Sequence, residues 1–464
     1  MAGKIAVILA AGLGKRMNSS RHKVVHEVCG KPMITHIVEE MQSVGFQRIV
    51  VVVGKLEEQV RAVLGDSVTY VRQHEQLGTG HAVMQVLPFL TDSSLTIVLY
   101  GDSPLIQKQD VVRLIDEAEK NHSTTVLTAE VEHPFAYGRI VRARDGSVDR
   151  IVEEKDANDI VRQIHEVNSG IYAFQTSELQ KALPKMTADN AQGEYLLTDC
   201  VVHIRSEGGR VIPVLMNDPR DIANVNDRVQ LAHVEKQMQS RILNRHMQNG
   251  VTIIDPTNTY AHADVKIGRD TVLYPGTILE GRTIIGTDCV IGPNSHVVNT
   301  TISDQVTVQS SVVLDSRIDQ AAVVGPFAYI RPHSDIGARA KIGDFVEIKK
   351  STIGADTKIS HLSYVGDSEV GARVNIGCGV VTVNYDGFVK HQTTIGDDSF
   401  IGSNVNLVAP IRIGTGGYVA TGSTVTDEVP EDAFAIARAR QTTKLGYVKG
   451  LKERLRKKSE NGQQ

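Results

Sequence analysis

The sequence predicts an α/β domain, a connecting helix and then a parallel β-helix. Short apolar runs alternate with helical patterns up to about residue 227. A single segment with helical periodicity follows. Beyond it, aliphatic residues recur every six positions, which is typical of hexapeptide repeats. We therefore expect three parts, at 1–227, 228–249 and 250–437, followed by a basic tail over 438–464.

The first part should contain a mostly parallel sheet covered by helices. Its runs IAVILA, RIVVVVG and SLTIVLYGD are short and continuously apolar, as strands buried on both faces are. Helical patterns at Met33–Val44 and Glu57–Leu64 lie between them. Ligands of such sheets bind beyond the carboxyl ends of the strands. The turn at Gly12 and the segment ending in Asp102 both follow a strand, so we expect a ligand site there.

The turn after the first strand carries two glycines, Gly12 and Gly14, and then Lys15 and Arg16. We expect a strand, a tight turn and the start of a helix here. A dinucleotide-binding fingerprint would need a third glycine where Met17 stands. A P-loop would need Ser or Thr after Gly-Lys, where this chain has Arg16. The turn therefore matches neither phosphate-binding motif.

The connecting segment should form one helix. Leu231, Val234, Met238 and Ile242 fall on one face of it, and Gly250 marks a natural end. We interpret it as an arm between the two larger parts.

The repeat of six defines the last part. Each unit supplies one short strand with its aliphatic side chain pointing inward, and three units complete a coil. A generic all-β domain is the alternative, which three long runs disfavour. The longest interruption, TVNYDGFVKHQT at 382–393, should project as a loop and build a binding surface. The runs are Ile267, Leu273, Leu279, Ile285, Ile291 and Val297; Val324, Ile330, Ile336, Ile342 and Ile348; and Ile395, Ile401, Leu407, Ile413, Val419 and Val425.

Composition excludes several classes of protein. The 464 residues are 41% apolar and 22% charged, with net charge −4, which gives no reason to expect a nucleic-acid partner. No run approaches the roughly 18 apolar residues of a membrane span, and the N-terminus lacks a secretion signal. The four scattered cysteines suit reduced thiols in the cytoplasm better than disulfides or zinc. The tail from Arg438 carries nine Lys or Arg against two Glu, and we favour a solvated tail over a phosphate-binding one.

Taken together, these motifs resemble those of a known family over nearly the whole chain. The chain is similar to the bacterial bifunctional N-acetylglucosamine-1-phosphate uridyltransferase/glucosamine-1-phosphate acetyltransferases. The resemblance implies a Rossmann-like nucleotidyltransferase domain, a linker helix and a left-handed parallel β-helix that associates as a homotrimer. The segments that carry it are LAAGLGKRM, KVVH and GKPM (within 9–33), EQLGTGHA (75–82), YGDSPL (100–105), YGRI (137–140), VEEKDA (152–157), NSGIY (168–172), NAQGEYLLTD (190–199), GPFAYIRP (325–332), HLSYVGD (361–367) and VTVNYDG (381–387).

The resemblance implies a first active site that transfers uridylyl from UTP to N-acetylglucosamine 1-phosphate and releases pyrophosphate. Catalysis of this kind depends on positioning and on cations, here Arg16 and Lys23. Asp102 and Asn226 would bind Mg²⁺. Where many members have Pro-Lys, this chain has His22-Lys23. The substrate-binding residues implied are Leu9, Ala10, Ala11, Gly12, Lys23, Gln73, Gly78, Thr79, Tyr100, Gly101, Asp102, Gly138, Glu153, Asn168 and Asn226.

The resemblance also implies a second site, which acetylates glucosamine 1-phosphate with acetyl-CoA. His361 would be the general base, oriented or charge-stabilised by Glu347, and Asn384 would donate to the developing oxyanion. Cys378 and Thr421 stand where the family has alanine, and we expect Cys378 to be a small buried core residue rather than a nucleophile. Arg331, Lys349, Tyr364 and Asn375 would bind the acceptor, and Cys378, Asn384, Tyr385, Ser403, Thr421 and Arg438 would bind acetyl-CoA.

Two rival functions remain. One is a single-activity nucleotidyltransferase whose β-helix is only an oligomerisation scaffold, which would not need the cluster around His361. The other is a catalytically dead sugar-nucleotide sensor, which would be expected to lose Asp102, Lys23 or Arg16, and all three are present. We therefore expect an enzyme with two activities that supplies UDP-N-acetylglucosamine for the cell envelope.

Overall fold

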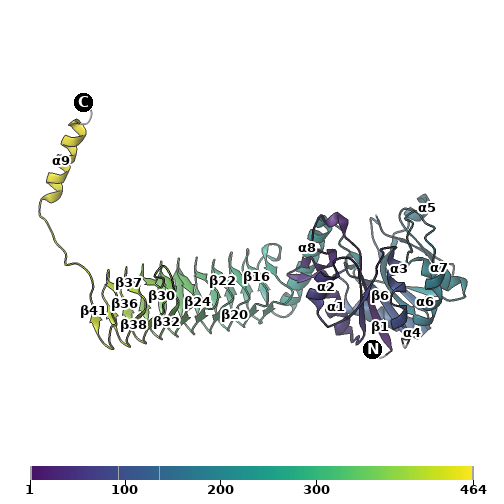
Figure 1. Cartoon of the computed structure of the whole chain (residues 1–464), viewed down its shortest axis with the longest axis horizontal. Coiled ribbons are helices and arrows are strands. Elements are labelled where there is room, and N and C mark those ends of the chain that lie inside the picture. Colours follow the sequence, from purple (N-terminus) through teal and green to yellow (C-terminus); the bar gives the residue numbers. More distant parts are fainter. Residues whose placement is uncertain (1–2, 92, 135, 462–464) are drawn as a thin grey trace. The chain divides into compact units, whose positions relative to one another are not determined.

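The computed structural model describes residues 3–91, 93–134 and 136–461. The chain forms two compact units: residues up to Arg245 together with Ala261–Ala263, and His246–Tyr260 together with the chain from Asp264 on (Figure 1). The predicted boundaries of the functional parts, at 227 and 249, stay a prediction. Residues 462–464 of the predicted tail lie outside the described residues.

The first unit is built on a nine-stranded sheet with the order β11-β7-β10-β6-β1-β4-β5, and a β8–β9 hairpin beside β10. The sheet is parallel except that β10 runs against β6, β7 and β8, and β8 runs against β9. Its strands are β1 (Lys4–Ala10), β4 (Ile49–Val53), β5 (Thr69–Arg72), β6 (Leu95–Tyr100), β7 (Thr124–Glu130), β8 (Arg139–Arg142), β9 (Val148–Val152), β10 (Glu166–Gln175) and β11 (Val211–Leu215). A separate pair, β2 (Glu27–Val28) and β3 (Lys31–Pro32), follows the first turn.

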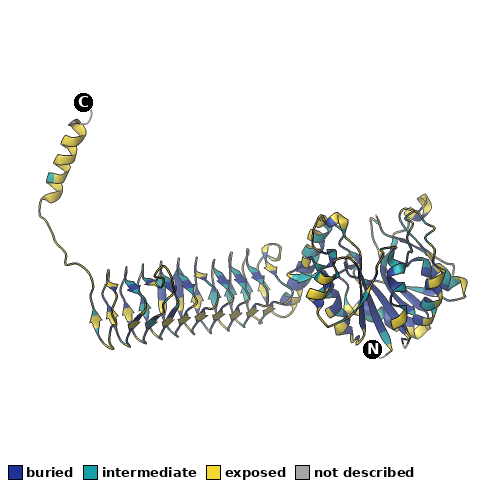
Figure 2. Cartoon of the chain, in the orientation of Figure 1, coloured by how far each residue is buried: buried dark blue, intermediate teal, exposed yellow. Residues whose placement is uncertain are grey.

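Helices cover both faces of this sheet, as the continuously apolar strands predict (Figures 1 and 2). On β1, Ile8 packs into a core with α1, α2 and α4, whereas Val7 packs into a second core with α3, α6 and α7. The helices are α1 (Met33–Val44), α2 (Glu57–Leu64), α3 (Thr79–Met84), α4 (Lys108–Asn121), α5 (Asp159–Arg162), α6 (Thr176–Ala182) and α7 (Asp199–Ser206). Short 3₁₀ turns are η1 (Lys15–Met17), η2 (Lys23–Val25), η3 (Leu87–Phe89), η4 (Leu183–Lys185) and η5 (Pro219–Ile222).

The turn after β1 differs from the prediction of a helix start. Only the 3₁₀ turn η1 forms there, and the first α-helix begins at Met33. Gly14 and Asn18 flank η1 in the left-handed conformation, with φ of 58° and 48°. Two left-handed residues so close together prevent a helix from continuing in either direction.

The predicted connecting helix is present as α8 (Arg228–Gln248). Val234, Met238 and Ile242 on its predicted face are buried, and Gly250, with φ of 93°, follows its end. Within the first unit, Glu235 of this helix accepts a hydrogen bond from the backbone N–H of Cys29 at 2.7 Å. The helix is therefore packed into the first unit along much of its length.

The second unit is a parallel β-helix of three stacked sheets with 11, 10 and 9 strands (Figure 1). The first sheet contains β12 (Thr252–Ile253), β15 (Val272–Leu273), β18 (Val290–Ile291), β21 (Thr307–Val308), β24 (Val323–Val324), β27 (Lys341–Asp344), β30 (Lys358–His361), β33 (Asn375–Ile376), β36 (Phe400–Ile401), β39 (Tyr418–Val419) and β41 (Phe434–Ala435). The second contains β13 (Tyr260–Ala261), β16 (Ile278–Glu280), β19 (His296–Val298), β22 (Val312–Leu314), β25 (Tyr329–Ile330), β28 (Glu347–Lys349), β31 (Tyr364–Gly366), β34 (Val381–Val383), β37 (Asn406–Val408) and β40 (Thr424–Val425). The third contains β14 (Lys266–Ile267), β17 (Ile284–Ile285), β20 (Thr301–Ile302), β23 (Arg317–Ile318), β26 (Asp335–Ile336), β29 (Thr352–Ile353), β32 (Ser368–Val370), β35 (Thr393–Ile395) and β38 (Ile411–Ile413).

The predicted aliphatic runs occupy the inward positions of these strands. Leu273, Ile342 and Leu407, for example, are fully buried. The coil also continues through the gaps between the runs, because some of its sides are five residues long, as between Val297 and Ile302. The predicted interruption at 382–393 is the connection between β34 and β35.

The basic tail contains a helix, α9 (Tyr447–Asn461). Within the part of the chain that the structure describes, no helix is both long and apolar enough to cross a membrane.

Candidate active sites

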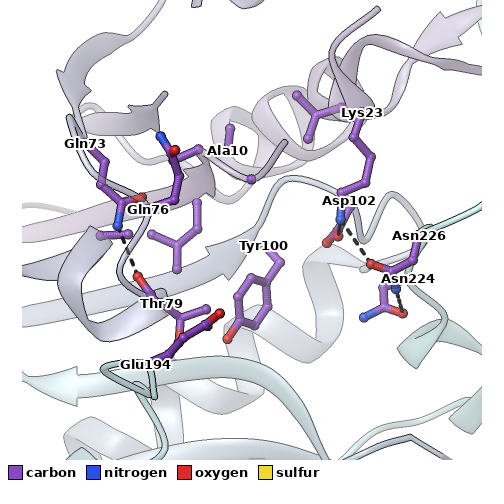
Figure 3. Close-up of a pocket in the computed structure, with 16 residues that line it drawn as sticks. Ala10, Lys23, Gln73, Gln76, Thr79, Tyr100, Asp102, Glu194, Asn224 and Asn226 are labelled. Atoms are coloured by element: carbon purple, nitrogen blue, oxygen red, sulfur yellow. Dashed lines mark hydrogen bonds and ion pairs between the residues drawn. The ribbon is translucent and has the colours of Figure 1, made fainter. Parts of the chain in front are cut away.

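A cavity of about 380 Å³ lies at the carboxyl ends of β1 and β6 in the first unit (Figure 3). Parallel pairing brings these ends together, since Leu9 is in register with Tyr100, and Ala10 with Val53. The cavity is lined by Leu9, Ala10, Ala11, Gly12, Lys23, Val24, Gln73, Gln76, Gly78, Thr79, Ala82, Tyr100, Asp102, Glu194, Asn224 and Asn226.

Lys23 forms the charged centre of this cavity (Figure 3). Its ammonium group forms an ion pair with Asp102 and donates a hydrogen bond to Oδ1 of Asn226 at 3.1 Å. The side chains of Lys23 and Asp102 are only 14% and 12% exposed. The carbonyl of Asp102 accepts a hydrogen bond from the N–H of Val225 at 3.0 Å, which ties the loop carrying Asn226 to the end of β6.

Gly14 makes room for Lys23. A Cβ at Gly14 would lie 2.6 Å from Cβ of Lys23, closer than real carbon atoms approach. Its φ of 58° also lies in the region that favours glycine. The glycine turn therefore allows the backbone after β1 to run directly against the side chain of Lys23.

Gln73, Gly78 and Thr79 form another wall of the cavity (Figure 3). The buried amide of Gln73 donates to the carbonyl of Gly78 at 3.1 Å and lies 3.0 Å from Nδ1 of His81. The hydroxyl of Thr79 accepts from the N–H of Leu197 at 3.0 Å. This wall presents amide and backbone groups at fixed positions, which suits pairing with the edge of a flat base.

Gly138, Glu153 and Asn168 form a group next to Tyr100 and outside the cavity lining. The N–H of Asn168 donates to the carbonyl of Gly138 at 2.8 Å, and a Cβ at Gly138 would lie 3.5 Å from a carboxylate oxygen of Glu153. Burial raises the pKa of Glu153. Burial, followed by the nearby charge of Glu153, also raises the pKa of Tyr100. The structure thus brings these three predicted residues together.

Asp102 and Asn226 suit a divalent metal ion. They present two oxygen atoms to one cation, which in the free protein is the ammonium of Lys23. Mg²⁺ prefers such oxygen ligands and often takes only one or two of them from the protein. Over residues 3–91, 93–134 and 136–461, no cluster of three or more His, Cys, Asp or Glu suits a metal. A metal at this site would therefore depend on these two residues and on a bound phosphate.

On the β-helix, His361 stands at the end of β30 with its side chain 60% exposed. Its Nδ1 lies 2.6 Å from the carboxylate of Asp344, which is paired with it one coil earlier. The hydrogen bond from His361 lowers the pKa of Asp344. Glu347, the predicted partner of His361, forms an ion pair with Arg331 at 2.9 Å, so its role at His361 stays a prediction. Glu347 lies on β28, which belongs to a different sheet of the β-helix from β30, where His361 lies.

A second polar network includes residues of the sheet that contains β28. Lys349 forms an ion pair with Asp367 at 2.7 Å, and the buried amide of Asn384 donates to Asp367 and, at 3.3 Å, to the hydroxyl of Tyr364. The hydroxyl of Tyr385 donates to the carbonyl of Gly387 in the loop after β34 at 2.6 Å. Asn375 begins β33, beside Lys358 of β30.

A cavity of about 730 Å³ adjoins Lys349 and is rich in cationic side chains. An anionic group such as a phosphate would be attracted to it. His361 is absent from its lining, which consists of His333, Lys349, Lys350, Ser351, Thr352, Asp367, Ser368, Glu369, Lys390, His391 and Gln392.

Cys378, Ser403 and Thr421 continue the row that starts with Asp344 and His361. In this sheet the inward aliphatic residue of each strand is in register with that of the neighbouring strand. Each residue of the row lies two positions after the inward aliphatic residue of its own strand. The carbonyl of Cys378 accepts a hydrogen bond from Asn404, and that of Ser403 accepts one from Gly422. Arg438 lies beside the last residue of this row: its Cδ would be 3.7 Å from a Cβ placed on Gly422, which follows Thr421.

The expectation that Cys378 is buried is wrong. Its side chain is exposed, because it lies at a corner of the coil, immediately before Gly379 with φ of 76°. An exposed corner position is compatible with contact to a ligand, but not with a role in the core.

Comparison with known proteins identifies the family. Residues 6–167 match the model of the MobA-like NTP transferase domain, and residues 264–299 match that of the bacterial transferase hexapeptide with six repeats. Proteins named "Bifunctional protein GlmU" from Brevibacillus brevis, a Geobacillus species and Acetivibrio thermocellus are 52%, 51% and 53% identical to this chain. The alignments cover 98%, 97% and 96% of this chain and 99%, 99% and 97% of those proteins. The chain belongs to the GlmU family.

Membership of the GlmU family confirms the predicted fold class and the prediction of a bifunctional enzyme with uridyltransferase and acetyltransferase activities. It does not favour the single-activity alternative. A solved structure of UDP-glucose pyrophosphorylase complexed with UDP-glucose covers 51% of this chain and 99% of its own, at 18% identity and a TM-score of 0.42, too low to support an argument.

Most uridyl-site residues predicted for this GlmU protein line the first cavity, but five do not: Gly138, Glu153 and Asn168, described above, together with Arg16 and Gly101. Arg16 is exposed on η1, and Gly101 donates its N–H to the carbonyl of Leu9 between the two strands. Sequence reasoning missed other lining residues. Asn224 had a signal, since it lies two positions before Asn226 and accepts a hydrogen bond from its amide at 3.2 Å. The residues missed are Val24, Gln76, Ala82, Glu194 and Asn224.

Proposed function

We propose that this GlmU protein acetylates glucosamine 1-phosphate on its β-helix and then transfers uridylyl to N-acetylglucosamine 1-phosphate in its first unit. The product would be UDP-N-acetylglucosamine for the cell envelope. The group formed by Lys23, Asp102 and Asn226 at the carboxyl ends of β1 and β6 is the observation that carries the uridyl assignment. Family membership carries the pairing of the two activities.

In the uridyl step, an oxygen of the sugar phosphate attacks the α-phosphorus of UTP, and the bond to pyrophosphate breaks. Negative charge spreads over phosphate oxygens, so cations and exact placement supply most of the catalysis. Lys23 would contact the phosphates from inside the cavity, and the exposed Arg16 would approach them from the turn. Gln73, Gly78 and Thr79 would hold the uracil, while Gly138, Glu153 and Asn168 would hold the sugar.

The family implies a divalent metal ion at the uridyl site, and we assign Mg²⁺ to Asp102 and Asn226. When bound, such an ion neutralises charge that develops on the phosphates. Asp102 and Asn226 would hold the ion through the two oxygens that Lys23 contacts in the free protein, and the ammonium of Lys23 would then be available to a phosphate of UTP.

In the acetyl step, the amine of glucosamine 1-phosphate attacks the thioester carbonyl of acetyl-CoA. A C–N bond forms, the C–S bond breaks, and the amine proton passes to His361 while the thiolate leaves and is protonated. Asp344 would hold the imidazole and stabilise its charged form. Arg331 and Lys349 would bind the sugar phosphate, with Tyr364 and Asn375 beside it.

Asn384 would donate a hydrogen bond to the oxyanion that forms on the thioester carbonyl. Its amide already donates to Asp367 and Tyr364, so one of these bonds must be exchanged for the bond to the oxyanion. Acetyl-CoA would lie along Cys378, Ser403, Thr421 and Arg438, with Asn384 and Tyr385 at its thioester end.

We further propose that the β-helix assembles as a homotrimer and that the enzyme works in the cytoplasm, where UTP and acetyl-CoA are available. The side chain of His361 is 60% exposed in the single chain, which supports an acetyl site that a neighbouring copy completes. Closed cyclic symmetry is the general form of such assemblies.

One assay tests the proposed function. The purified protein is given Mg²⁺, UTP, glucosamine 1-phosphate and acetyl-CoA, and free thiol and pyrophosphate are followed separately. We expect thiol release first and pyrophosphate release after it. Pyrophosphate release from added N-acetylglucosamine 1-phosphate, without any thiol release from glucosamine 1-phosphate, would instead make the β-helix a scaffold.

Replacing Gly14 by alanine should weaken uridyl transfer by roughly 10- to 100-fold in kcat/KM. The new Cβ cannot fit against Lys23 and must displace either the lysine or the turn. Steady-state pyrophosphate release measures this loss, and thiol release from the same preparation should be unchanged. Gly146→Ala is the matched control, because its φ of 81° imposes similar strain but nothing lies within 4 Å of the new Cβ. Equal losses in the two variants would contradict the close-contact argument.

A further inference from the structure

His22 occupies the position directly before Lys23 and is the N-cap of the 3₁₀ turn η2. Its side chain is almost completely buried, with 1% of the residue exposed. Its backbone has φ of −60° and ψ of 140°, which are values that a proline would adopt. Histidine lacks the pyrrolidine ring that fixes this φ in proline, so other contacts must keep the segment in place.

Two hydrogen bonds do so. The backbone N–H of His22 donates to Oε1 of Gln59 on α2 at 2.7 Å, a bond that proline lacks the hydrogen to make. Nδ1 of the ring accepts from the N–H of Val24 at 3.3 Å, which caps the 3₁₀ turn that begins with Lys23. Gln59 also donates to the carbonyl of Ser20 at 3.2 Å. The segment before Lys23 is thus held to α2 at two points and capped at its end.

The cap requires a neutral imidazole, because Nδ1 can accept a hydrogen bond only when it carries no proton. Burial, followed by the charge of Lys23, lowers the pKa of His22 to about 4. Glu58 and His26 are the other titratable groups that act on it. The ring therefore remains an acceptor at neutral pH.

We propose that His22 is a positioning residue for uridyl transfer: with Gln59 it fixes the start of η2 and so holds the backbone of Lys23 at the cavity, from where its ammonium reaches Asp102 and Asn226 in the free protein and would reach a phosphate of UTP in the complex. Hydrogen bonds to α2 and to η2 replace the restriction that a proline ring would supply. This inference rests on the proposed uridyl activity of the first unit.

The test compares His22→Ala, His22→Asn and His22→Pro in the full-length protein, with kcat and KM for UTP from pyrophosphate release. We expect His22→Ala to lower kcat roughly tenfold with a smaller change in KM, because a misplaced catalytic group costs rate. His22→Asn should restore much of it, since asparagine caps in the same way. His22→Pro should also restore it through its fixed φ. Thiol release, which depends on the β-helix, should be unchanged in all three.

Gln59→Ala supplies an independent arm. We expect it to lower kcat in the same direction, and the double variant His22→Ala/Gln59→Ala to fall less than the two single losses combined, because both residues act on one segment. Gln42→Ala, at an exposed position on α1, is the matched control and should leave kcat unchanged.

A wild-type kcat for His22→Ala overturns the proposal, as does a loss that neither asparagine nor proline restores. If the wild-type protein itself releases no pyrophosphate, the proposed uridyl activity fails instead, so the two failures are distinguishable.

Discussion

Replacing Asp102 by asparagine should lower uridyl transfer by roughly 10²–10³-fold while acetyl transfer continues unchanged. The substitution preserves the size of the side chain but removes the carboxylate that forms the ion pair with Lys23. Glu194 is the other carboxylate among the described residues that line the cavity. Both the ion pair of the free enzyme and the main oxygen ligand for a divalent ion would be lost. Pyrophosphate release at saturating UTP measures the effect, and thiol release from the same sample reports an intact β-helix.

Metal binding gives a second readout that is independent of turnover. Mn²⁺ can replace Mg²⁺ as a probe, and its electron paramagnetic resonance signal falls when the protein binds it. The Asp102→Asn variant should leave most Mn²⁺ free in the presence of UTP. Asp116→Asn, which makes the same chemical change on the exposed side of α4, should behave as the wild type in both assays. A variant at Asp102 that keeps more than about a third of the wild-type rate would contradict the assignment.

Replacing His361 by alanine should lower acetyl transfer by roughly 10²–10⁴-fold, the usual contribution of a general base. Uridyl transfer to added N-acetylglucosamine 1-phosphate should stay at the wild-type rate, because that site lies in the other unit. His296→Ala is a close control: Nε2 of His296 lies 2.8 Å from the carboxylate of Glu280 on the same β-helix, and its side chain is 40% exposed. Unchanged thiol release after loss of His361 would rule it out as the base.

The partner of His361 can be tested separately. Asp344→Asn keeps a side chain that can still contact the imidazole but removes its negative charge. We expect kcat for thiol release to fall by roughly tenfold with little change in KM, since the charge acts on the protonated imidazole formed during reaction. Because the hydrogen bond from His361 lowers the pKa of Asp344, the wild-type pair should persist into mildly acidic solution. Glu347→Gln should instead raise KM for glucosamine 1-phosphate, because Glu347 orients Arg331.

Much of the fold could be predicted from the sequence because the inward positions of both units follow simple periods. Leu273 and Ile342 belong to runs of aliphatic residues that recur every six positions. Both occupy the inward position of a strand in the same sheet of the β-helix. The gaps in that period could not be predicted. A side of the coil can close with five residues when a corner residue such as Asn299 adopts the left-handed conformation, with φ of 47°.

The sites could be predicted where they follow from the ends of strands. Asp102 lies two residues beyond the end of β6, and its proximity to the turn after β1 is a consequence of parallel pairing. Glu194 and Gln76 lie in loops whose path depends on tertiary packing, so no local pattern marks them. The contact between Asp344 and His361 could have been predicted, because Asp344 precedes His361 by one coil in the same register and such residues are neighbours.

The row that runs from His361 through Cys378 and Ser403 to Thr421 places one side chain per coil along one edge of the β-helix. Neighbouring strands of a sheet are about 4.8 Å apart, so these three steps span about 14 Å along the coil. One residue per coil can then touch an extended molecule at regular intervals, at a spacing fixed by backbone hydrogen bonds and not by side-chain packing. If the proposed function holds, a ligand bound lengthwise along this edge with its reactive end at His361 would lose the contacts of one coil when it is shortened by one interval.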